Sequence, residues 1–315
     1  IHSIITSLLY RNGPEDLRLI LVDPKRVELT LYNKIPHLLT PVITDPKKTI
    51  LSLKWAAKEM ERRYEILQSH SLQNISSYHK NILEPELKKR GNTKSPDDKP
   101  IETMPYIVIV IDELADIMQA YTRELESAIV RLAQMSRAVG IHLIVSTQRP
   151  SVNVITGTIK ANFPARLSFK VMSKIDSRTI LDAGGADQLV GMGDMLLSMG
   201  SEVIRLQCAF VDTPEVEEIC DFIGNQQGYT SAYLLPEPDS EEMGGQERGD
   251  VDLGDRDSFF DEAARLVVMH QQGSTSLIQR KLKLGYNRAG RLIDQLEVAG
   301  IVGSFGGSKA REVLV

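Results

Sequence analysis

A run of six residues, YIVIVI at 106–111, is the feature that most constrains the fold of this 315-residue chain. Its β-branched side chains are typical of a central strand in a parallel sheet that is buried on both faces. Two similar apolar runs, LRLILVD at 17–23 and IHLIVST at 141–147, are also predicted as strands, and stretches with helical spacing separate the three runs. Strands that alternate with helices predict a parallel, right-handed α/β sheet.

The segments around these strands complete the α/β pattern. Residues 1–10 have apolar positions at helical spacing. Asp45 and Pro46 provide an N-cap followed by a proline at the first helical position, which predicts a helix that runs to about Gln68. Three more helices are expected, at 75–90, 122–138 and 214–227. Two more strands are expected, at 165–171 and 203–211.

An acidic segment divides the chain at residues 237–256. It carries eight acidic and two basic residues, is rich in glycine and cannot bury a core, so we expect a flexible linker. The predicted organisation is a large α/β domain at 1–236 and a small domain at 257–315. Because the linker alone carries a charge of −6, against a net charge of −5 for the chain, the overall acidity does not exclude a nucleic-acid partner for the folded parts.

Residues 257–315 show the order of a winged helix-turn-helix domain. Helices are predicted at 258–270, 274–282 and 287–299, and a glycine-rich hairpin is predicted at 301–315. Three helices followed by a β-hairpin is typical of this DNA-binding architecture.

Composition narrows the cellular setting. Cys208 and Cys220 are interpreted as free thiols of a reducing cytosol, and the six histidines show no zinc-ligand spacing. No apolar run reaches the roughly 20 residues that span a bilayer. The chain begins at Ile1 without a methionine, so we expect a cytoplasmic fragment of a longer protein.

Asp112 and Glu113 directly follow the YIVIVI run, at the edge where ligands of open α/β sheets bind. An aspartate in this place can hold Mg²⁺ through water, and the adjacent glutamate can polarise a water for attack on a γ-phosphoryl group. The alternative is a strand end whose acids simply start the next helix, because an apolar run followed by Asp-Glu is a loose pattern.

Gln148 follows the 141–147 strand and is a candidate sensor of the γ-phosphate. Its side-chain amide can both donate and accept a hydrogen bond. The alternative is a turn set by Arg149 and Pro150, since the proline restricts the residue before it.

Seven long segments carry a resemblance to one family. They are DPKRVEL (23–29), IPHLLTPVITDPKK (35–48), EMERRYEIL (59–67), YIVIVIDELADIM (106–118), RLAQMSRAVGIHLIVSTQRPSVNVITGTIKANFPARLSF (131–169), SKIDSRTILDAGGADQLVGMGDML (173–196) and LGYNRAGRLIDQLEVAGIVG (284–303). All resemble the FtsK/SpoIIIE DNA translocases. The resemblance covers nearly the whole chain, apart from the 84–104 loop and the linker.

The resemblance implies a RecA-like motor domain that forms a hexameric ring around duplex DNA, with ATP and Mg²⁺ bound between subunits. It implies that Arg137 reaches into the neighbouring subunit's site as an arginine finger, because a planar guanidinium suits the charge on a transferring phosphoryl group. Lys174 is implied to bind nucleotide near the same interface, although the sequence also allows it a place in the pore. Without the resemblance, Arg137 would be read as a solvated charge at a helix end.

The family's pore loops correspond to 149–162 and 173–178. Arg149, Lys160 and Arg178 are therefore the candidates for DNA contact. They would grip phosphates, because a motor that walks along any sequence cannot depend on bases.

Asn287, Arg291 and Asp294 are the candidate base readers of the small domain. They lie at i, i+4 and i+7, on one face of the predicted third helix. Arginine can bind guanine bidentately and an acid can accept from cytosine. At the position of Asp294 the family usually has glutamate. The aspartate side chain is shorter than that of glutamate by one methylene group. The alternative is that Asn287 caps the helix and Arg291 lies on a solvated face.

The chain departs from the family in its phosphate-binding loop. No G-x-x-x-x-G-K-[ST] motif occurs in the 315 residues, so we expect the chain to be inactive alone. The resemblance implies a parent that couples ATP hydrolysis to movement along duplex DNA in chromosome segregation and cell division. It also implies an anchor in the bacterial inner membrane outside this chain, and a Xer-type recombinase as a partner of the winged helix.

Two other functions remain open at this level. One is a conjugation-type coupling ATPase, against which the C-terminal GYNRA segment argues. The other is a degenerate or split DNA-binding protein without enzymatic activity, which the missing loop favours and the presence of Asp112, Glu113, Gln148 and Arg137 disfavours.

Overall fold

The computed structural model describes two compact units, Ile1–Pro238 and Asp239–Val315, and each is considered by itself. The described residues are 1–90, 102–200, 202–226, 259–271 and 273–282, together with 289, 292, 293, 295–297, 299–303, 313 and 314. The predicted linker at 237–256 lies outside them, and the domain boundaries stay a prediction.

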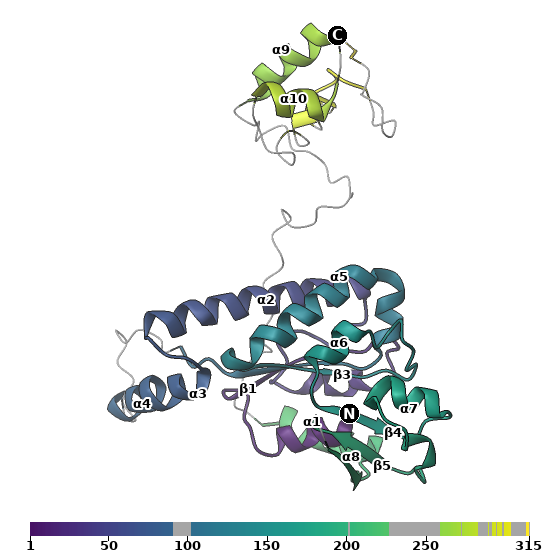
Figure 1. Ribbon diagram of the computed structural model, residues 1–315. Coiled ribbons are helices and arrows are strands. Elements are labelled where there is room, and N and C mark those ends of the chain that lie inside the picture. Colours follow the sequence, from purple (N-terminus) through teal and green to yellow (C-terminus); the bar gives the residue numbers. More distant parts are fainter. Residues whose placement is uncertain are drawn as a thin grey trace. The chain divides into compact units, whose positions relative to one another are not determined.

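A three-stranded parallel sheet forms the centre of the first unit (Figure 1). Its strands are β1 (Leu17–Val22), β2 (Tyr106–Ile111) and β3 (Ile141–Val145), in the order β1-β2-β3. Leu17 pairs with Tyr106, and Ile107 pairs with Ile141. The YIVIVI run is therefore the central strand of the parallel sheet, as predicted.

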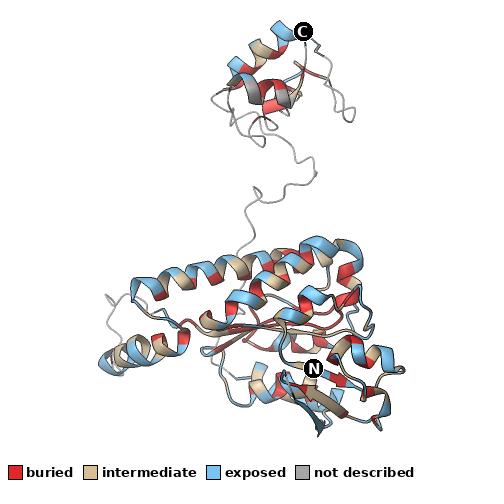
Figure 2. Ribbon diagram, viewed as in Figure 1, coloured by how far each residue is buried: buried red, intermediate tan, exposed pale blue. Residues whose placement is uncertain are grey.

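Helices cover both faces of this sheet. Figure 1 shows α2 (Pro46–Ser69) and α5 (Leu114–Met135) on one side, and α1 (His2–Leu9) and α8 (Thr213–Gly224) on the other. Figure 2 shows that the buried residues concentrate along the sheet and on the helix faces turned toward it. The arrangement is three layers, α/β/α, as expected for strands that alternate with helices.

Successive residues of each strand enter opposite cores, because side chains alternate along a strand. In β2, Ile107, Ile109 and Ile111 join the core beneath α2 and α5. Val108 and Val110 join the core beneath α1 and α8. Burial on both faces explains why this strand reads as a continuous apolar run.

The long helices begin at capping residues. The Asp45 side chain accepts a 3.1 Å hydrogen bond from the Lys48 backbone N–H, and Pro46 follows at the first helical position.

α5 begins at Leu114, eight residues before the predicted start at 122, so that prediction was wrong. The backbone at Tyr121 (φ −142, ψ 55) interrupts the helix, and the predicted segment corresponds to the part after this break.

A second sheet is antiparallel, which corrects the expectation of a wholly parallel sheet. It has the order β4-β5-β6, with β4 at Arg166–Phe169, β5 at Asp194–Ser198 and β6 at Val203–Gln207. Only residues 199–202 connect β5 to β6, whereas a parallel crossover needs a dozen residues or more. The sequence analysis did not predict β5.

The remaining elements of the first unit connect these layers. η1 (Leu29–Lys34) packs beside α8, while α3 (Ile75–Tyr78), the π-helical turn η2 (His79–Leu83) and α4 (Glu84–Arg90) together fill the helix predicted at 75–90. The last elements are η3 (Ser136–Val139), α6 (Gly157–Asn162), α7 (Lys174–Leu181) and η4 (Ala186–Gln188).

The second unit has α9 (Phe260–His270) and α10 (Thr275–Leu282) around a small core. An antiparallel bridge joins Val302 to Val313, where the hairpin was predicted. The core residues include Phe260, Val267, Ile278, Leu292 and Leu296. Among all described residues, no helix has both the length and the hydropathy that crossing a membrane requires.

Candidate functional site

The three parallel strands end at one edge of the sheet, where polar side chains gather. Asp23 follows β1, Asp112 and Glu113 follow β2, and Ser146–Gln148 follow β3. The Asp112 N–H donates to the Val22 carbonyl at 3.0 Å, and the Leu114 N–H donates to the Ser146 carbonyl at 2.8 Å. The structure therefore brings the predicted Asp112, Glu113 and Gln148 together.

Glu113 is fully buried, and hydrogen bonds engage both of its oxygens. Oε1 accepts from the Thr147 hydroxyl at 2.5 Å and from the Ala115 N–H at 3.2 Å. Oε2 accepts from the Gln148 N–H at 3.1 Å and from Lys25 Nζ at 3.3 Å. Although burial raises the pKa of Glu113, these bonds favour the carboxylate and hold the pKa below its usual value.

Asp112 lies beside Glu113, but its pKa is shifted in the opposite direction. The side chain is buried, and this burial is the main cause that raises its pKa to about 6. The nearby carboxylates of Glu28, Asp23 and Glu113 raise the pKa further. A carboxylate crowded by other acids is stabilised by a cation, so Asp112 suits a divalent metal.

The residues present define how such a cation would be held. Within the described parts of the chain, no group of three or more histidine, cysteine or acidic side chains is placed to bind a metal directly. Mg²⁺ commonly keeps several waters and is held by one or two carboxylates plus substrate phosphates. Asp112 alone fits that mode of binding.

Lys25 belongs to the same cluster, and the sequence analysis did not identify it. Its Nζ donates to Gln148 Oε1 at 2.9 Å as well as to Glu113. The only sequence signal is its place two residues after Asp23, in the DPKRVEL segment.

Arg137 lies at the other end of β3. It is an exposed residue of η3, which precedes the strand, whereas Gln148 follows the strand. Five residues of strand separate the two ends by about 17 Å. Within one subunit, Arg137 is therefore remote from Asp112 and Glu113.

The predicted phosphate-gripping residues lie in the α6–α7 region and beyond β3. Arg149 is paired with Asp116 at 3.4 Å, and Lys160 in α6 is paired with Asp182 at 2.6 Å. Arg178 is exposed in α7, and so is Lys174. To bind Arg149 and Lys160, DNA phosphates would therefore have to compete with Asp116 and Asp182.

The three candidate base readers, Asn287, Arg291 and Asp294, lie outside the described residues.

Both cysteines are free thiols. Burial raises the pKa of Cys220 to about 11, so it is a core residue rather than a reactive one.

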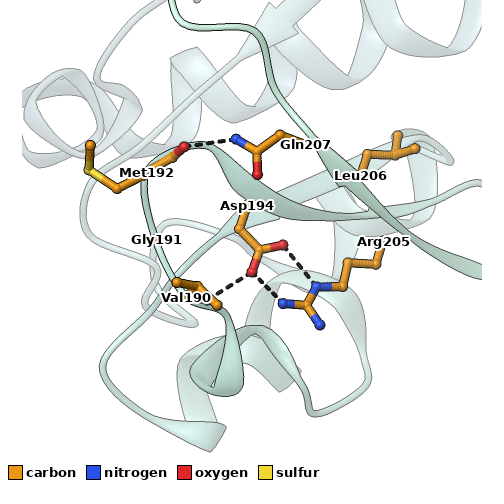
Figure 3. Close-up of a pocket in the computed structure, with 7 residues that line it drawn as sticks. All are labelled: Val190, Gly191, Met192, Asp194, Arg205, Leu206 and Gln207. Carbon is orange, nitrogen blue, oxygen red and sulfur yellow. Dashed lines mark hydrogen bonds and ion pairs between the residues drawn. The ribbon is translucent and has the colours of Figure 1, made fainter.

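Two hollows of the first unit lie away from the strand-end cluster. One, with a volume of about 520 Å³, is shown in Figure 3. In this hollow the Asp194 carboxylate accepts two hydrogen bonds from the Arg205 guanidinium, at 2.9 and 2.7 Å, and one from the Val190 N–H, at 2.8 Å. The other, of about 630 Å³, lies between the loop that follows α1 (residues 10–14) and α8. Neither is lined by Asp112, Glu113 or Gln148.

Comparison with known proteins identifies both parts of the chain. Residues 1–152 match the model of the FtsK/SpoIIIE family, and residues 254–315 match that of the Ftsk gamma domain. The chain is 51% identical to the DNA translocase FtsK of Chlorobaculum tepidum and 47% identical to the DNA translocase SpoIIIE of Bacillus subtilis. Both alignments include the whole chain, but it spans only 39% and 38% of these relatives.

Solved structures confirm the RecA-like α/β fold. The conjugation coupling protein TcpA of pCW3, solved with ATPγS, is 25% identical with a TM-score of 0.56, over 70% of this chain and 60% of that one. The type VII secretion ATPase EccC of Thermomonospora curvata is 21% identical with a TM-score of 0.57, over 75% of this chain and 27% of that one. The higher identity to translocases and the gamma-domain match disfavour the two alternative functions.

Proposed function

Because this chain belongs to the FtsK/SpoIIIE family, we propose that it is part of an ATP-driven motor that moves along double-stranded DNA in chromosome segregation and cell division. The observation that carries the proposal is the cluster at the carboxyl edge of the parallel sheet. It joins Asp112 and Glu113 of the central strand to Gln148 of the neighbouring strand.

The cluster supports ATP and Mg²⁺ as ligands. Asp112 would hold Mg²⁺ through water, and the bound metal would neutralise charge on the phosphates. Glu113 would orient and polarise the attacking water, and the Gln148 amide would sense the γ-phosphate. The related TcpA was solved with ATPγS, which supports ATP as the nucleotide of this chain.

The place of Arg137 supports a ring of identical subunits, of which we propose six. A residue about 17 Å from the cluster cannot act within its own subunit. It can act as an arginine finger only in a neighbour's site, where Lys174 would also bind nucleotide. ATP would then lie between subunits.

We propose that DNA is bound at two levels. Arg149, Lys160 and Arg178 of the motor domain (1–236) would grip phosphates in the ring. Beyond the linker (237–256), the winged helix (257–315) would read bases through Asn287, Arg291 and Asp294. The gamma-domain match over 254–315 supports the second role.

The family resemblance supports three further proposals about the longer protein. They are an anchor in the bacterial inner membrane outside the 315 residues, a Xer-type recombinase bound through the winged helix, and the use of the motor at division. Each rests on the resemblance alone.

Hydrolysis can be tested in a chimera, because the 315 residues contain no phosphate-binding loop. In the chimera this chain replaces the aligned region of Chlorobaculum tepidum FtsK. We expect DNA-stimulated phosphate release from the chimera and none above background from the 315-residue chain. Asp112→Ala should abolish release, and Glu113→Gln should keep nucleotide binding but stall hydrolysis. Glu124→Gln, at an exposed acid of α5, is the control. An inactive, folded chimera would contradict the proposal.

Base reading can be tested on the 315-residue chain by fluorescence anisotropy at fixed salt. We expect tighter binding to a G-rich duplex than to a scrambled one, and Arg291→Ala should remove about 1–3 kcal/mol of that preference. Lys281→Ala, an exposed cation of α10, should weaken both complexes equally. Equal affinity of the wild-type chain for both duplexes would exclude sequence reading.

A further inference from the structure

Lys25 connects three strand ends at the proposed nucleotide site. From a loop after β1, its ammonium lies 3.3 Å from Glu113 Oε2, after β2, and 2.9 Å from Gln148 Oε1, after β3. The Glu113 side chain is fully buried and that of Lys25 is 32% exposed. We propose that Lys25 is a positioning residue, which orients the Glu113 carboxylate and the Gln148 side-chain amide for hydrolysis. The inference rests on the proposed function.

The loop after β1 is built to place this lysine. Buried Asp23 accepts hydrogen bonds from four backbone N–H groups: those of Lys25 and Arg26 on Oδ1, at 3.1 and 2.9 Å, and those of Glu28 and Leu29 on Oδ2, at 3.0 Å each. Arg26 adopts a left-handed backbone conformation, with φ of 60°. Because Asp23 fixes this turn, the Lys25 backbone is held where its side chain can reach the ends of β2 and β3.

The contact with Gln148 determines which way its amide points. A lysine ammonium has only donors, so the atom that faces it must be the amide oxygen and not the nitrogen. The Gln148 NH₂ group is therefore directed away from Lys25. The oxygens of a γ-phosphate accept hydrogen bonds, so a sensor of that phosphate needs a donor. Lys25 thus gives Gln148 the orientation that its proposed role requires.

The contact with Glu113 places one carboxylate oxygen toward the accessible side of the cluster. Thr147, Ala115 and the Gln148 backbone supply three of the four bonds to Glu113, and all are shorter than the 3.3 Å bond from Lys25. Lys25 is also the one of these four donors on a long, partly exposed side chain. Lys25 therefore approaches Glu113 from the partly exposed side of the cluster, and its bond fixes Oε2 on that side.

The kinetic test compares Lys25→Met with Lys25→Arg in the chimera with Chlorobaculum tepidum FtsK. Lys25→Met keeps an unbranched side chain but removes the donor. We expect its kcat for ATP to fall on the order of 10- to 100-fold while KM changes less than about threefold, since misorientation affects the reacting geometry. Lys25→Arg, which keeps the charge and the donors, should recover part of the loss. Arg26→Met removes the same charge one residue away and should match the wild type.

A second readout does not depend on catalysis. In the nucleotide-free 315-residue chain, the side-chain NH₂ resonances of Gln148 should shift in Lys25→Met and stay in place in Arg26→Met. Unchanged Gln148 resonances, or a raised KM with unchanged kcat, would overturn the positioning role. An inactive wild-type chimera would count against the proposed function, and the resonances would still decide whether Lys25 orients Gln148.

Discussion

The buried guanidinium of Arg63 donates a 2.9 Å hydrogen bond from Nη1 to the backbone carbonyl of Val139. Its Nε donates to Glu59 at 2.7 Å, so the charge is paired within α2. Val139 is the last residue of η3, the turn that carries Arg137. The neighbouring Tyr64 hydroxyl donates to the Met135 carbonyl at 2.6 Å, just before that turn. Two side chains of α2 thus hold the backbone on which the proposed arginine finger stands.

Arg63→Met should lower the free energy of unfolding by about 3 kcal/mol. Breaking a buried pair typically costs about 3–5 kcal/mol, and the lower end applies because Glu59 keeps Arg62 as a partner. Arg62→Met is the matched control: Arg62 is 44% exposed, and we expect a loss within about 1 kcal/mol. Urea denaturation of the 315-residue chain measures both. Equal losses would show that the bond to Val139 contributes little.

Gly140→Ala should destabilise the first unit by about 2–3 kcal/mol. Gly140 ends η3 in the left-handed region, with φ of 75°. A Cβ there would lie 2.6 Å from Ile75 Cδ1 and 3.0 Å from Tyr106 Cδ1, so backbone strain and overpacking add together. Gly157→Ala, where no atom lies within 4 Å, should be neutral or slightly stabilising. A thermal midpoint unchanged by Gly140→Ala would contradict this account.

Local signals were sufficient to predict the parallel core. The apolar runs gave β1, β2 and β3 because these strands are buried on both faces, and the Asp45-Pro46 pair marked the start of α2. The start of α5 was predicted late because the backbone at Tyr121 interrupts the helix, and only the part after this break was identified from the sequence. The connection of β5 to β6 contains Gly200-Ser201, a pair that favours a tight hairpin turn, but the five-residue β5 was not predicted as a strand, so this signal was not used.

The candidate site was predictable only in part. Asp112, Glu113 and Gln148 follow two apolar runs, and parallel neighbours necessarily end at the same edge. Lys25 reaches Glu113 across 88 positions of the chain and Gln148 across 123. Such contacts depend on the tertiary fold, and one surface lysine looks like any other in a sequence without an alignment.

Asp194→Asn should lower stability in a pH-dependent way. The hydrogen bonds from Arg205, then that from Val190, lower the Asp194 pKa to about 2. An acid with a lowered pKa stabilises the fold above its unfolded pKa of about 4, and this contribution is lost as the pH falls through about 2. The thermal midpoints of wild type and variant should therefore differ at pH 7 and converge below about pH 4. Glu202→Gln, at an exposed acid, should show no such convergence.

Asp112→Asn should have the opposite effect and stabilise the nucleotide-free chain. The Asp112 pKa is raised to about 6, so the folded state binds this proton more tightly than the unfolded state. The stability that this provides is present below about pH 4 and is lost as the pH rises through about 6. At pH 8 the variant should gain about 1 kcal/mol, or roughly 2–4 °C in Tm, and at pH 4 almost nothing. Millimolar Mg²⁺ should narrow the difference at pH 8. A destabilised variant at pH 8 would contradict the raised pKa.

Arg137→Ala should separate hydrolysis from nucleotide binding, and it should do so across a subunit boundary. Arg137 is exposed at the amino end of β3, about 17 Å from the cluster at the carboxyl end, so we expect its guanidinium to act in the site of a neighbouring subunit. In the chimera, hydrolysis should fall on the order of 10³-fold with little change in nucleotide affinity, as for other arginine fingers. Arg131→Ala, on the same stretch of chain but paired with Glu61, is the control and should retain activity.

Mixing subunits tests the direction of this contact. Neither Arg137→Ala nor Asp112→Ala rings should hydrolyse ATP, since each site lacks either the finger or the metal ligand. In mixed rings, some sites combine Asp112 of an Arg137→Ala subunit with Arg137 of an Asp112→Ala subunit, and these sites are intact. Phosphate release should therefore recover to a maximum at intermediate ratios. If mixed rings form, as crosslinking of differently labelled subunits would show, and activity stays at background at every ratio, then Arg137 does not act in trans.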